Sequence, residues 1–600
     1  MPVLLYDKRV KLTEINSNQI RLFSQWALVF CLTLGWLGII LSLGGMFFGM
    51  IIKIYLVIAL IGSVFILIKN WKKDFWKSEF FLASIIALSV TLIFLFWSMP
   101  TIFSGRDQGS LSEAAIRLTE NHRLTFSSPI SEEFYKIYGP GRALNFPGFN
   151  YNFAGQLITQ FSPGYISWLA AFYAVFGLSG WAVANGLTFF IFLISFYLIA
   201  RRFLPFGPAL TGLFLILTAF IFPWFLKFTL SENLAWALFW FGILQLINFW
   251  QKFDKGSFIY LILTWSLLTF SRPETWTFIL VILILLILKF KNNQNWLKLV
   301  ADKKIWILVL AILAVFTGSI WVNPQAFIEI FKGIAKPLLF FQQEVSSTNA
   351  FSLFFYMLAI LKTYFLLGFL IFAVIEIFIL IWRKKIKILL PFLVGLPTFF
   401  YLVQPGITLD HPWMLRRLAF AVIPLLILYT VFFLHEFLKK RLFFYGILSL
   451  MLAGNIWITV SFLTFVPDKN LWQQTASLSQ NFAKEDLIFV DQKASGSGWS
   501  MLTGPLDFIF GRQAAYLFNP KDVAKINLDR FADVYFIIPF GQLSFYEENG
   551  LKLIYVKNYQ LQNRVLEENL VNKNKIGEPQ VILPKIKEIV VNGGIYKLVK

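Results

Sequence analysis

From residue 24 to residue 466 the sequence alternates between long apolar runs and short polar segments. Each run is about 20 residues long, the length with which an α-helix crosses roughly 30 Å of hydrocarbon. The first run has no small-residue cleavage site and is interpreted as a retained span, not a signal peptide. The pattern predicts a polytopic α-helical membrane protein with about 13 full spans.

One apolar run does not fit this alternation. The segment 164–178, "GYISWLAAFYAVFGL", has 15 residues and ends at a Gly-Leu-Ser-Gly turn before the next run at 181–200. If both runs crossed the membrane, every later loop would change sides. We therefore predict a partial helix on the outer side for 164–178.

After Pro467 the apolar stretches shrink to strand length. The segments 486–490, 534–540 and 551–556 are predicted strands, and 586–599 is a predicted hairpin that turns at 592–594. We expect an outer α/β or α+β domain of about 130 residues. The chain thus divides into a cytoplasmic segment with a two-span hairpin (1–78), a transmembrane catalytic domain (79–466) with a large outer loop (100–163), and a soluble domain (467–600).

Composition supports the membrane class and charge orients the chain. The chain is 58% hydrophobic and 14% charged, which excludes a set of soluble domains. Its net charge of +21 comes from short clusters between spans, as in cytoplasmic loops, so nucleic acid is not a predicted partner. These clusters are at 69–73, 201–202, 289–304, 383–387 and 439–441. The N-terminus, with Lys8, Arg9 and Lys11, is predicted to be cytoplasmic, and residues 467–600 are predicted to lie outside.

The outer loop opens with "GRDQG", which contains Asp107. Ser110 and Glu113 have the spacing of a capping box for a helix that runs to about Leu124. Asp107 is a candidate functional carboxylate, because polar residues near membrane depth often mark function. The alternative is a charge that the helix macrodipole favours at its N-terminus.

Four more polar clusters lie on the predicted outer side. The segment 146–168 is rich in Gly, Pro, Asn and aromatic residues, and indicates either a pocket-shaping loop or an interfacial aromatic belt. Glu232 opens a span behind Ser231 and could serve as an acid of the helix's first turn. Arg272 and Glu274 flank a proline between two spans, where a local ion pair is the simpler interpretation. The last cluster is Asp410, His411, Arg416 and Arg417; two outer arginines there favour an anionic ligand, and the alternative is an ordinary outer loop.

The chain resembles the membrane glycosyltransferases of the GT-C superfamily. The resemblance is carried by six segments, which follow one another in the order "GRDQGSLSEAAIRL", "FSPGYISWLAAFYAVFG", "ARRF", "LSENLA", "SRPE" and "HPWMLRR". The resemblance covers roughly 79–465. Within this superfamily, the chain resembles the prokaryotic relatives of protein mannosyltransferases and of lipid A aminoarabinose transferases. These relatives are similar to glycosyltransferase family 39. It implies a plasma-membrane enzyme of a prokaryote that takes a sugar from a polyprenyl-phosphate donor on the outer face. Family members often carry an Asp-Glu pair in the first outer loop. Gln108 replaces the second acid here, so a divalent metal is a doubtful partner, and no other cofactor is implied.

The residues suit this chemistry. Asp107 could take the proton of an acceptor hydroxyl as general base. Arg272, His411, Arg416 and Arg417 could stabilise the departing phosphate, and one displacement would invert the anomeric centre. Arg106, Glu232, Glu274 and Asp410 are further candidate binding residues. The acceptor stays open among proteins, glycolipids and cell-wall polymers.

Two other classes remain as alternatives. A polysaccharide polymerase or ligase would also use a lipid-linked donor and outer arginines. A transporter or flippase would also place charges within the membrane, but would show broken helices and an internal repeat, which we do not find.

Overall fold

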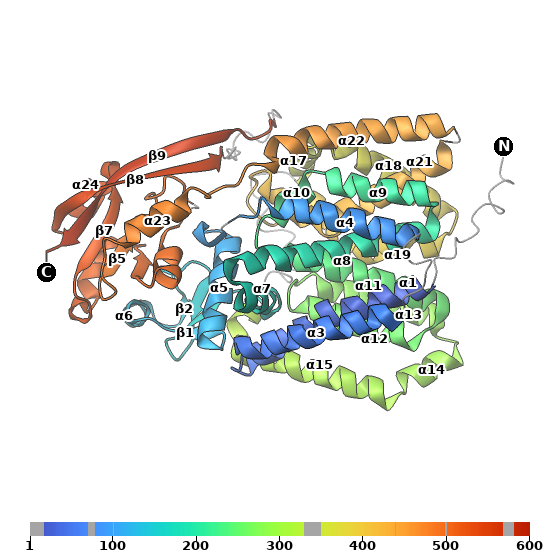
Figure 1. The fold of residues 1–600 in the computed structure, drawn as a ribbon, viewed down its shortest axis with the longest axis horizontal. Coiled ribbons are helices and arrows are strands. Elements are labelled where there is room, and N and C mark those ends of the chain that lie inside the picture. Colours follow the sequence, from blue (N-terminus) through green and yellow to red (C-terminus); the bar gives the residue numbers. More distant parts are fainter. Residues whose placement is uncertain are drawn as a thin grey trace.

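The computed structural model describes residues 17–69, 78–99, 101–328, 350–438, 440–498, 501–567 and 581–599. The basic residues expected near the N-terminus, most of the 69–73 cluster and Lys439 lie outside these ranges. Within them, a bundle of long helices carries a smaller body with a β-sheet at one end (Figure 1). The expected architecture, a helical membrane domain with a C-terminal α/β or α+β domain, is confirmed.

The bundle is built around a central helix. Every residue in the most apolar stretch of α11 is buried, and the helix packs against α8 and α12. At the periphery, α3 and α15 expose apolar side chains such as Ile58, Ile61 and Ile307, as expected for surfaces that face lipid. The bundle helices are α1 (Ser17–Ala27), α2 (Leu34–Leu43), α3 (Gly49–Lys69), α4 (Glu79–Leu95), α8 (Gly180–Phe203), α9 (Phe206–Thr218), α10 (Ile221–Leu226), α11 (Glu232–Lys252), α12 (Lys255–Thr269), α13 (Thr275–Phe290), α14 (Gln294–Val300), α15 (Lys303–Val322), α17 (Ala350–Thr363), α18 (Leu367–Trp382), α19 (Ile386–Gly395), α20 (Arg416–Ala419), α21 (Val422–Phe437) and α22 (Arg441–Leu463).

The predicted number of spans is not confirmed by the described helices. Among the described residues, 6 helices are long and apolar enough to cross a membrane, or up to 8 if each bent pair is one span. Four further apolar helices, including α4 and α13, are shorter. The expected thirteen spans are not confirmed, because several apolar runs form helices of only 10–17 residues and the α17–α18 pair bends by 113°.

The segment that broke the alternation forms a short helix, α7 (Pro163–Phe176), followed by a turn at Gly177. The Tyr165 hydroxyl donates to Asn185 Oδ1 (2.7 Å), and the Trp168 indole donates to the carbonyl of Ala184 (3.3 Å). Residues 16–20 apart in one straight helix would lie about 25–30 Å apart. The chain therefore reverses at Gly177, and α7 folds back onto α8 beside the outer loop.

The outer loop is a compact layer at the end of the bundle. It contains α5 (Asp107–Asn121), α6 (Pro129–Tyr138) and an antiparallel sheet in the order β1-β4-β3-β2. The strands are β1 (Thr125–Phe126), β2 (Gly141–Arg142), β3 (Phe149–Tyr151) and β4 (Leu157–Thr159). The segment 146–168 thus supplies a β3–β4 hairpin, whose Phe149 and Tyr151 are buried.

The C-terminal domain has a mixed sheet in the order β6-β5-β7-β9-β8, with β5 parallel to β6 and β7. Its main elements are α23 (Leu471–Ser479), β5 (Leu487–Val490), β6 (Gln513–Tyr516), β7 (Val534–Pro539), α24 (Leu543–Glu548), β8 (Leu553–Leu566) and β9 (Ile586–Leu598). The predicted strands at 486–490 and 534–540 are confirmed as β5 and β7. Strand β6 was not predicted.

The hairpin predicted at 592–594 is wrong. Gly593 and Gly594 lie inside the single long strand β9, between β7 and β8. A Cβ atom on Gly593 would come within 2.4 Å of the Ile538 carbonyl oxygen and 2.5 Å of the Tyr559 ring. The glycines allow neighbouring strands and rings to approach closely, which is another use of glycine within a strand.

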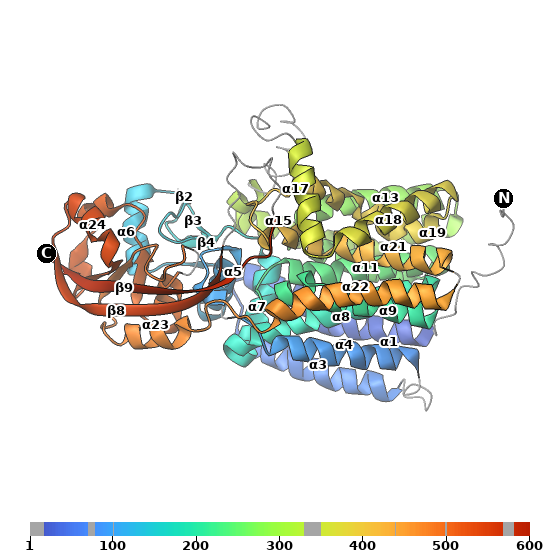
Figure 2. The same ribbon diagram turned by 90° about the horizontal axis from the view of Figure 1, so that it is seen from above.

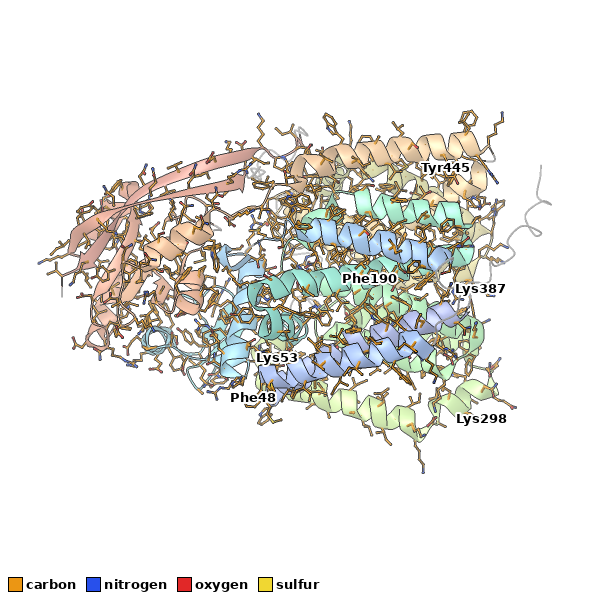
Figure 3. All side chains as sticks on the ribbon, viewed as in Figure 1. Phe48, Lys53, Phe190, Lys298, Lys387 and Tyr445 are labelled. Atoms are coloured by element: carbon orange, nitrogen blue, oxygen red, sulfur yellow. The ribbon has the colours of Figure 1, made fainter. Side chains whose placement is uncertain are left out.

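The two ends of the bundle carry different elements. The outer loop and the C-terminal domain share one end, and the described N-terminal helix α1 begins at the other (Figure 2). Figure 3 shows Lys298 and Lys387 at the end away from the C-terminal domain, and Phe48 at the end that faces it. The candidate residues of the outer loop and of the loops before α11, α13 and α20 therefore meet at the end that carries the soluble domain.

Candidate active site

Asp107 is the first residue of α5, and Arg106 precedes the helix in an extended conformation without a side-chain cap. The Asp107 carboxylate instead accepts a hydrogen bond from Arg416 (Nη2–Oδ2, 2.6 Å), and its side chain is 41% exposed. The macrodipole favours a negative charge in this turn, so both functions predicted for Asp107 remain compatible with its position.

The predicted capping box is wrong. Helix α5 begins three residues before Ser110, whose hydroxyl donates to the Pro147 carbonyl (3.0 Å). Gly109 is required by packing, because a Cβ there would lie 1.7 Å from the Ser104 carbonyl oxygen. Ser104 and Gly109 thus hold the loop that leads into α5 tightly against the helix, close to Asp107.

A chain of ion pairs runs from Asp107 into the end of the bundle. Arg416 Nε lies 3.8 Å from Glu232 Oε1, and Arg272 Nη1 lies 2.8 Å from the same oxygen. Arg272 also forms a two-pronged contact with Glu274 (Nη2–Oε1 2.7 Å, Nε–Oε2 3.2 Å). The predicted local ion pair of Arg272 and Glu274 is therefore present, and it belongs to a larger network.

Arg272 and Arg417 differ in how closely they are paired with the acids and in how deeply they are buried. Arg272 is 4% exposed between two carboxylates, whereas Arg417 is 21% exposed and lies 4.0 Å from Glu232 and 3.8 Å from Glu274. The Arg417 guanidinium also sits over the Tyr401 ring, 5.8 Å from its centroid, and the Tyr401 hydroxyl donates to Glu274. Arg272 is a buried structural cation, and Arg417 is the more loosely held one.

A second ion pair lies beside the first network. Arg106 Nη2 is 2.7 Å from Asp410 Oδ2, and the Arg106 guanidinium stacks over Trp413 at 5.0 Å. His411 is buried and its Nδ1 lies 3.1 Å from the Tyr364 hydroxyl. Burial lowers the pKa of His411 to about 4, although the Asp410 carboxylate opposes the shift. Burial thus favours the neutral form of His411 in this structure, and the cationic function expected for it stays a prediction.

A cavity of about 660 Å³ lies over Asp107 and Arg416. One wall comes from the outer loop, with Arg142 and Gln160, and another from the loop that carries Thr408 and Trp413. The C-terminal domain closes the third side with Gln492, Tyr516 and Phe518. Glu232, Arg272 and Arg417 are not among the residues that line this cavity in the part of the chain that the structure describes.

Sequence reasoning missed several residues of this arrangement. Tyr401 and the cavity residues Arg142, Gln492, Tyr516 and Phe518 stand in segments without a distinctive motif. The segment 146–168 was a candidate pocket-shaping loop, and the structure brings its Pro147, Gly148, Phe149 and Gln160 into the wall. Besides the candidates Arg106, Asp107 and Arg416, the segment 146–168 therefore had a sequence signal for the cavity.

The carboxylates closest to the predicted site are paired with arginines. Asp107 and Asp410 are each bonded to an arginine. Gln108 lines a small cavity of about 60 Å³ together with Asp410 and His411. No group of three or more His, Cys, Asp or Glu side chains suited to a metal occurs among the described residues.

Known proteins were compared with the chain in sequence and in structure. No protein-family model matches the sequence, and no curated protein matches it. Among solved structures, the chain is similar to ArnT from Cupriavidus metallidurans in the apo state, at 11% identity and a TM-score of 0.49, over 85% of this chain and 97% of that one. A structure of the same protein bound to undecaprenyl phosphate matches at 11% identity and a TM-score of 0.49, over 87% and 98%. The oligosaccharyltransferase from Archaeoglobus fulgidus, in complex with zinc and sulfate, matches at 11% identity and 0.47, over 76% and 68%.

Proposed function

We propose that this protein is a membrane glycosyltransferase that moves a sugar from a polyprenyl-phosphate donor to an acceptor hydroxyl on the outer face. The observation that carries the proposal is the position of Asp107. A partly exposed carboxylate lies at the floor of a large cavity, bonded to an arginine that belongs to a cationic cluster at the end of an apolar bundle. The polyprenyl donor is suggested by the GT-C resemblance of the sequence motifs.

In the proposed reaction Asp107 acts as general base. The acceptor oxygen attacks the anomeric carbon of the sugar while the bond from that carbon to the phosphate oxygen breaks. The electron pair leaves with the phosphate, and the hydroxyl proton passes to the Asp107 carboxylate. A single displacement of this kind inverts the anomeric configuration.

Arg416 and Arg417 stabilise the charge that develops on the leaving phosphate. Arg416 is bonded to Asp107 in this structure, so a phosphate that takes over this arginine releases the carboxylate at the same time. Donor binding and exposure of the base are thereby coupled. Arg417 suits a phosphate because its contacts of 3.8 and 4.0 Å to acids are loose, and an arginine fork matches phosphate oxygens in pairs.

Asp107→Asn tests the proposal. The amide is nearly isosteric but accepts no proton, so we expect about a 100-fold or larger loss of turnover. The measurement is release of polyprenyl phosphate from a mixture of polyprenyl-phosphate hexoses and pentoses by the purified protein in lipid nanodiscs, followed by mass spectrometry. Thermal unfolding of the same samples shows whether the variant is folded.

Glu113→Gln is the matched control, because it removes a carboxylate from the same helix without touching the cavity. It should keep its turnover within about twofold, as expected for a residue that supplies no general base. A folded Asp107→Asn protein with undiminished turnover would contradict the function of Asp107. A wild-type protein that releases no polyprenyl phosphate from any donor would contradict the transferase itself.

A further inference from the structure

The cavity over Asp107 is closed by the C-terminal domain, whose place is fixed by contacts with the outer loop. Asn145 donates from Nδ2 to the carbonyl of Tyr516 at the end of β6 (2.7 Å). Glu133 on α6 lies 3.1 Å from Arg530 Nη1 and also accepts from the Asn527 backbone N–H (3.1 Å). These contacts hold Tyr516 and its neighbours as a wall of the cavity.

The wall supplied by the C-terminal domain combines aromatic surface with amide groups. The Phe518 side chain is 52% exposed at the cavity, two residues after Tyr516. The Tyr516 hydroxyl donates to Gln492 Oε1 (3.2 Å), which orients that side chain and leaves its NH₂ group to donate. Gln160 adds a second amide from the opposite wall. A flat apolar ring between hydrogen-bonding amides suits a sugar ring, which has an apolar C–H face and hydroxyl edges.

One of the arginines that line the cavity has no ionic partner among the described residues. Arg106 is paired with Asp410, and Arg416 with Asp107. Arg142 at the rim is exposed and has no ionic partner among the described residues. A ligand that carries a carboxylate or a phosphate would supply the missing negative charge.

We propose that this cavity is the acceptor site and that it binds an anionic carbohydrate, with the sugar ring on Phe518 and Tyr516 and its acidic group at Arg142. The assignment as acceptor site rests on the proposed function: Asp107, the base, borders this cavity, whereas the deeper Arg272 and Arg417 do not. The C-terminal domain thereby selects the acceptor, and the bundle receives the donor. The acidic sugar can be part of a lipid headgroup or of a polymer.

Saturation-transfer NMR on the purified full-length protein in nanodiscs tests the site directly. The probes are glucuronate, glucose and the tripeptide Gly-Ser-Gly. We expect glucuronate to bind most tightly, glucose more weakly and the tripeptide least. Arg142→Gln should weaken glucuronate about five- to tenfold and leave glucose unchanged, since only the charged contact is lost. Phe518→Ala should weaken both sugars about tenfold.

Matched controls are Arg123→Gln, an exposed arginine of the same loop, and Phe540→Ala, a half-exposed aromatic residue of the same domain away from the cavity. Neither should change sugar binding. Equal binding of glucuronate to wild type, Arg142→Gln and Phe518→Ala would overturn the proposal, as would preferred binding of the tripeptide.

The transfer reaction separates this proposal from the proposed function. Arg142→Gln should raise the acceptor KM far more than it changes kcat. If sugar binding behaves as expected but no donor is turned over, the carbohydrate site stands and the transferase function falls. If Phe518→Ala and Arg142→Gln transfer sugar with unchanged KM, the transferase stands and the acceptor site is wrong. Glucuronate-terminated glycolipid in the nanodisc and a soluble glucuronate oligosaccharide then distinguish a lipid-linked acceptor from a polymer.

Discussion

Three arginines at the end of the bundle share the buried Glu232 and the partly buried Glu274, but the fold needs these arginines to different degrees. Arg272 lies between Glu232 and Glu274 with contacts of 2.8 and 2.7 Å, and its removal leaves the buried Glu232 and the partly buried Glu274 without their shortest arginine contact. Arg417 touches the same acids only at 4.0 and 3.8 Å. Burial with tight pairing indicates a structural cation, and loose pairing with partial exposure indicates a cation available to a ligand.

This difference gives a prediction for alanine variants. Arg272→Ala should lower the free energy of unfolding by about 3–5 kcal/mol, the usual cost of unpairing a buried charge. Arg417→Ala should change stability by less than about 1 kcal/mol, because its ion pairs are long and partly exposed. It should nevertheless lower turnover of the donor strongly, and Arg417→Lys should restore only part of it, since an ammonium group lacks the planar fork. Thermal unfolding beside polyprenyl phosphate release measures both; a stable Arg272→Ala protein or a fully active Arg417→Ala protein would contradict the assignment.

At the scale of elements, α5 connects the site with the C-terminal domain. Its first residue is Asp107, and about 15 Å further along the helix Arg117 contacts Asp507 of the C-terminal domain (Nη2–Oδ2, 2.5 Å). Glu113 lies between them, 3.9 Å from Arg117. Burial raises the pKa of Glu113 to about 7, with Arg117 opposing the shift and Asp507 and Glu120 adding to it. The junction of loop and domain thus contains an acid that is protonated more readily in the folded protein.

The sign of this pKa shift predicts how the junction responds to pH. A carboxyl group with a pKa of about 7 in the folded protein, against a usual value of 4.5, binds its proton more tightly when folded. Its contribution to stability is full below pH 4.5 and is lost as pH rises through 7. Glu113→Gln should remove this component, so the variant should lose less stability than wild type between pH 5 and pH 8. Unfolding temperatures of both proteins across that range measure it; parallel curves would show that Glu113 does not titrate there.

At the scale of the whole molecule, the two ends of the bundle carry different kinds of residues. The ion-pair network, the cavity and the C-terminal domain occupy one end, whereas Lys298 and Lys387 mark the other (Figure 3). Cytoplasmic loops are rich in lysine and arginine, so the end with the cavity is proposed to face outward. A lipid-linked donor flipped to that face would reach the arginines from the bilayer, and a water-exposed acceptor would reach Asp107 from the other side.

Cysteine labelling in intact cells checks this orientation. Ser544→Cys on exposed α24 should react with a membrane-impermeant maleimide, and Lys298→Cys should react only after the cells are opened. The natural Cys31 is buried within the bundle and serves as the unlabelled background. Labelling of Lys298→Cys and protection of Ser544→Cys would reverse the topology and place the cavity in the cytoplasm.

The sequence by itself determined the membrane class, the C-terminal α/β or α+β domain, strands β5 and β7, and the candidates Asp107, Arg416 and Arg417. These follow from hydrophobic run length and local composition, which report whether a segment faces lipid, water or a protein interior. The turn at Gly177 was likewise visible, because a Gly-Leu-Ser-Gly segment interrupts an apolar run that is too short to span.

Only the tertiary structure decided which acids and arginines meet, since Asp107 and Arg416 are 309 residues apart and no local pattern encodes their contact. It also decided that Gly593 and Gly594 pack inside β9, that α5 begins at Asp107 instead of at a capping box, and that His411 is buried where its neutral form is favoured. The wall of Gln492, Tyr516 and Phe518 exists because the C-terminal domain docks on α5 and α6. Such contacts depend on how folded surfaces fit together, and hydrophobic periodicity contains no information about a distant partner.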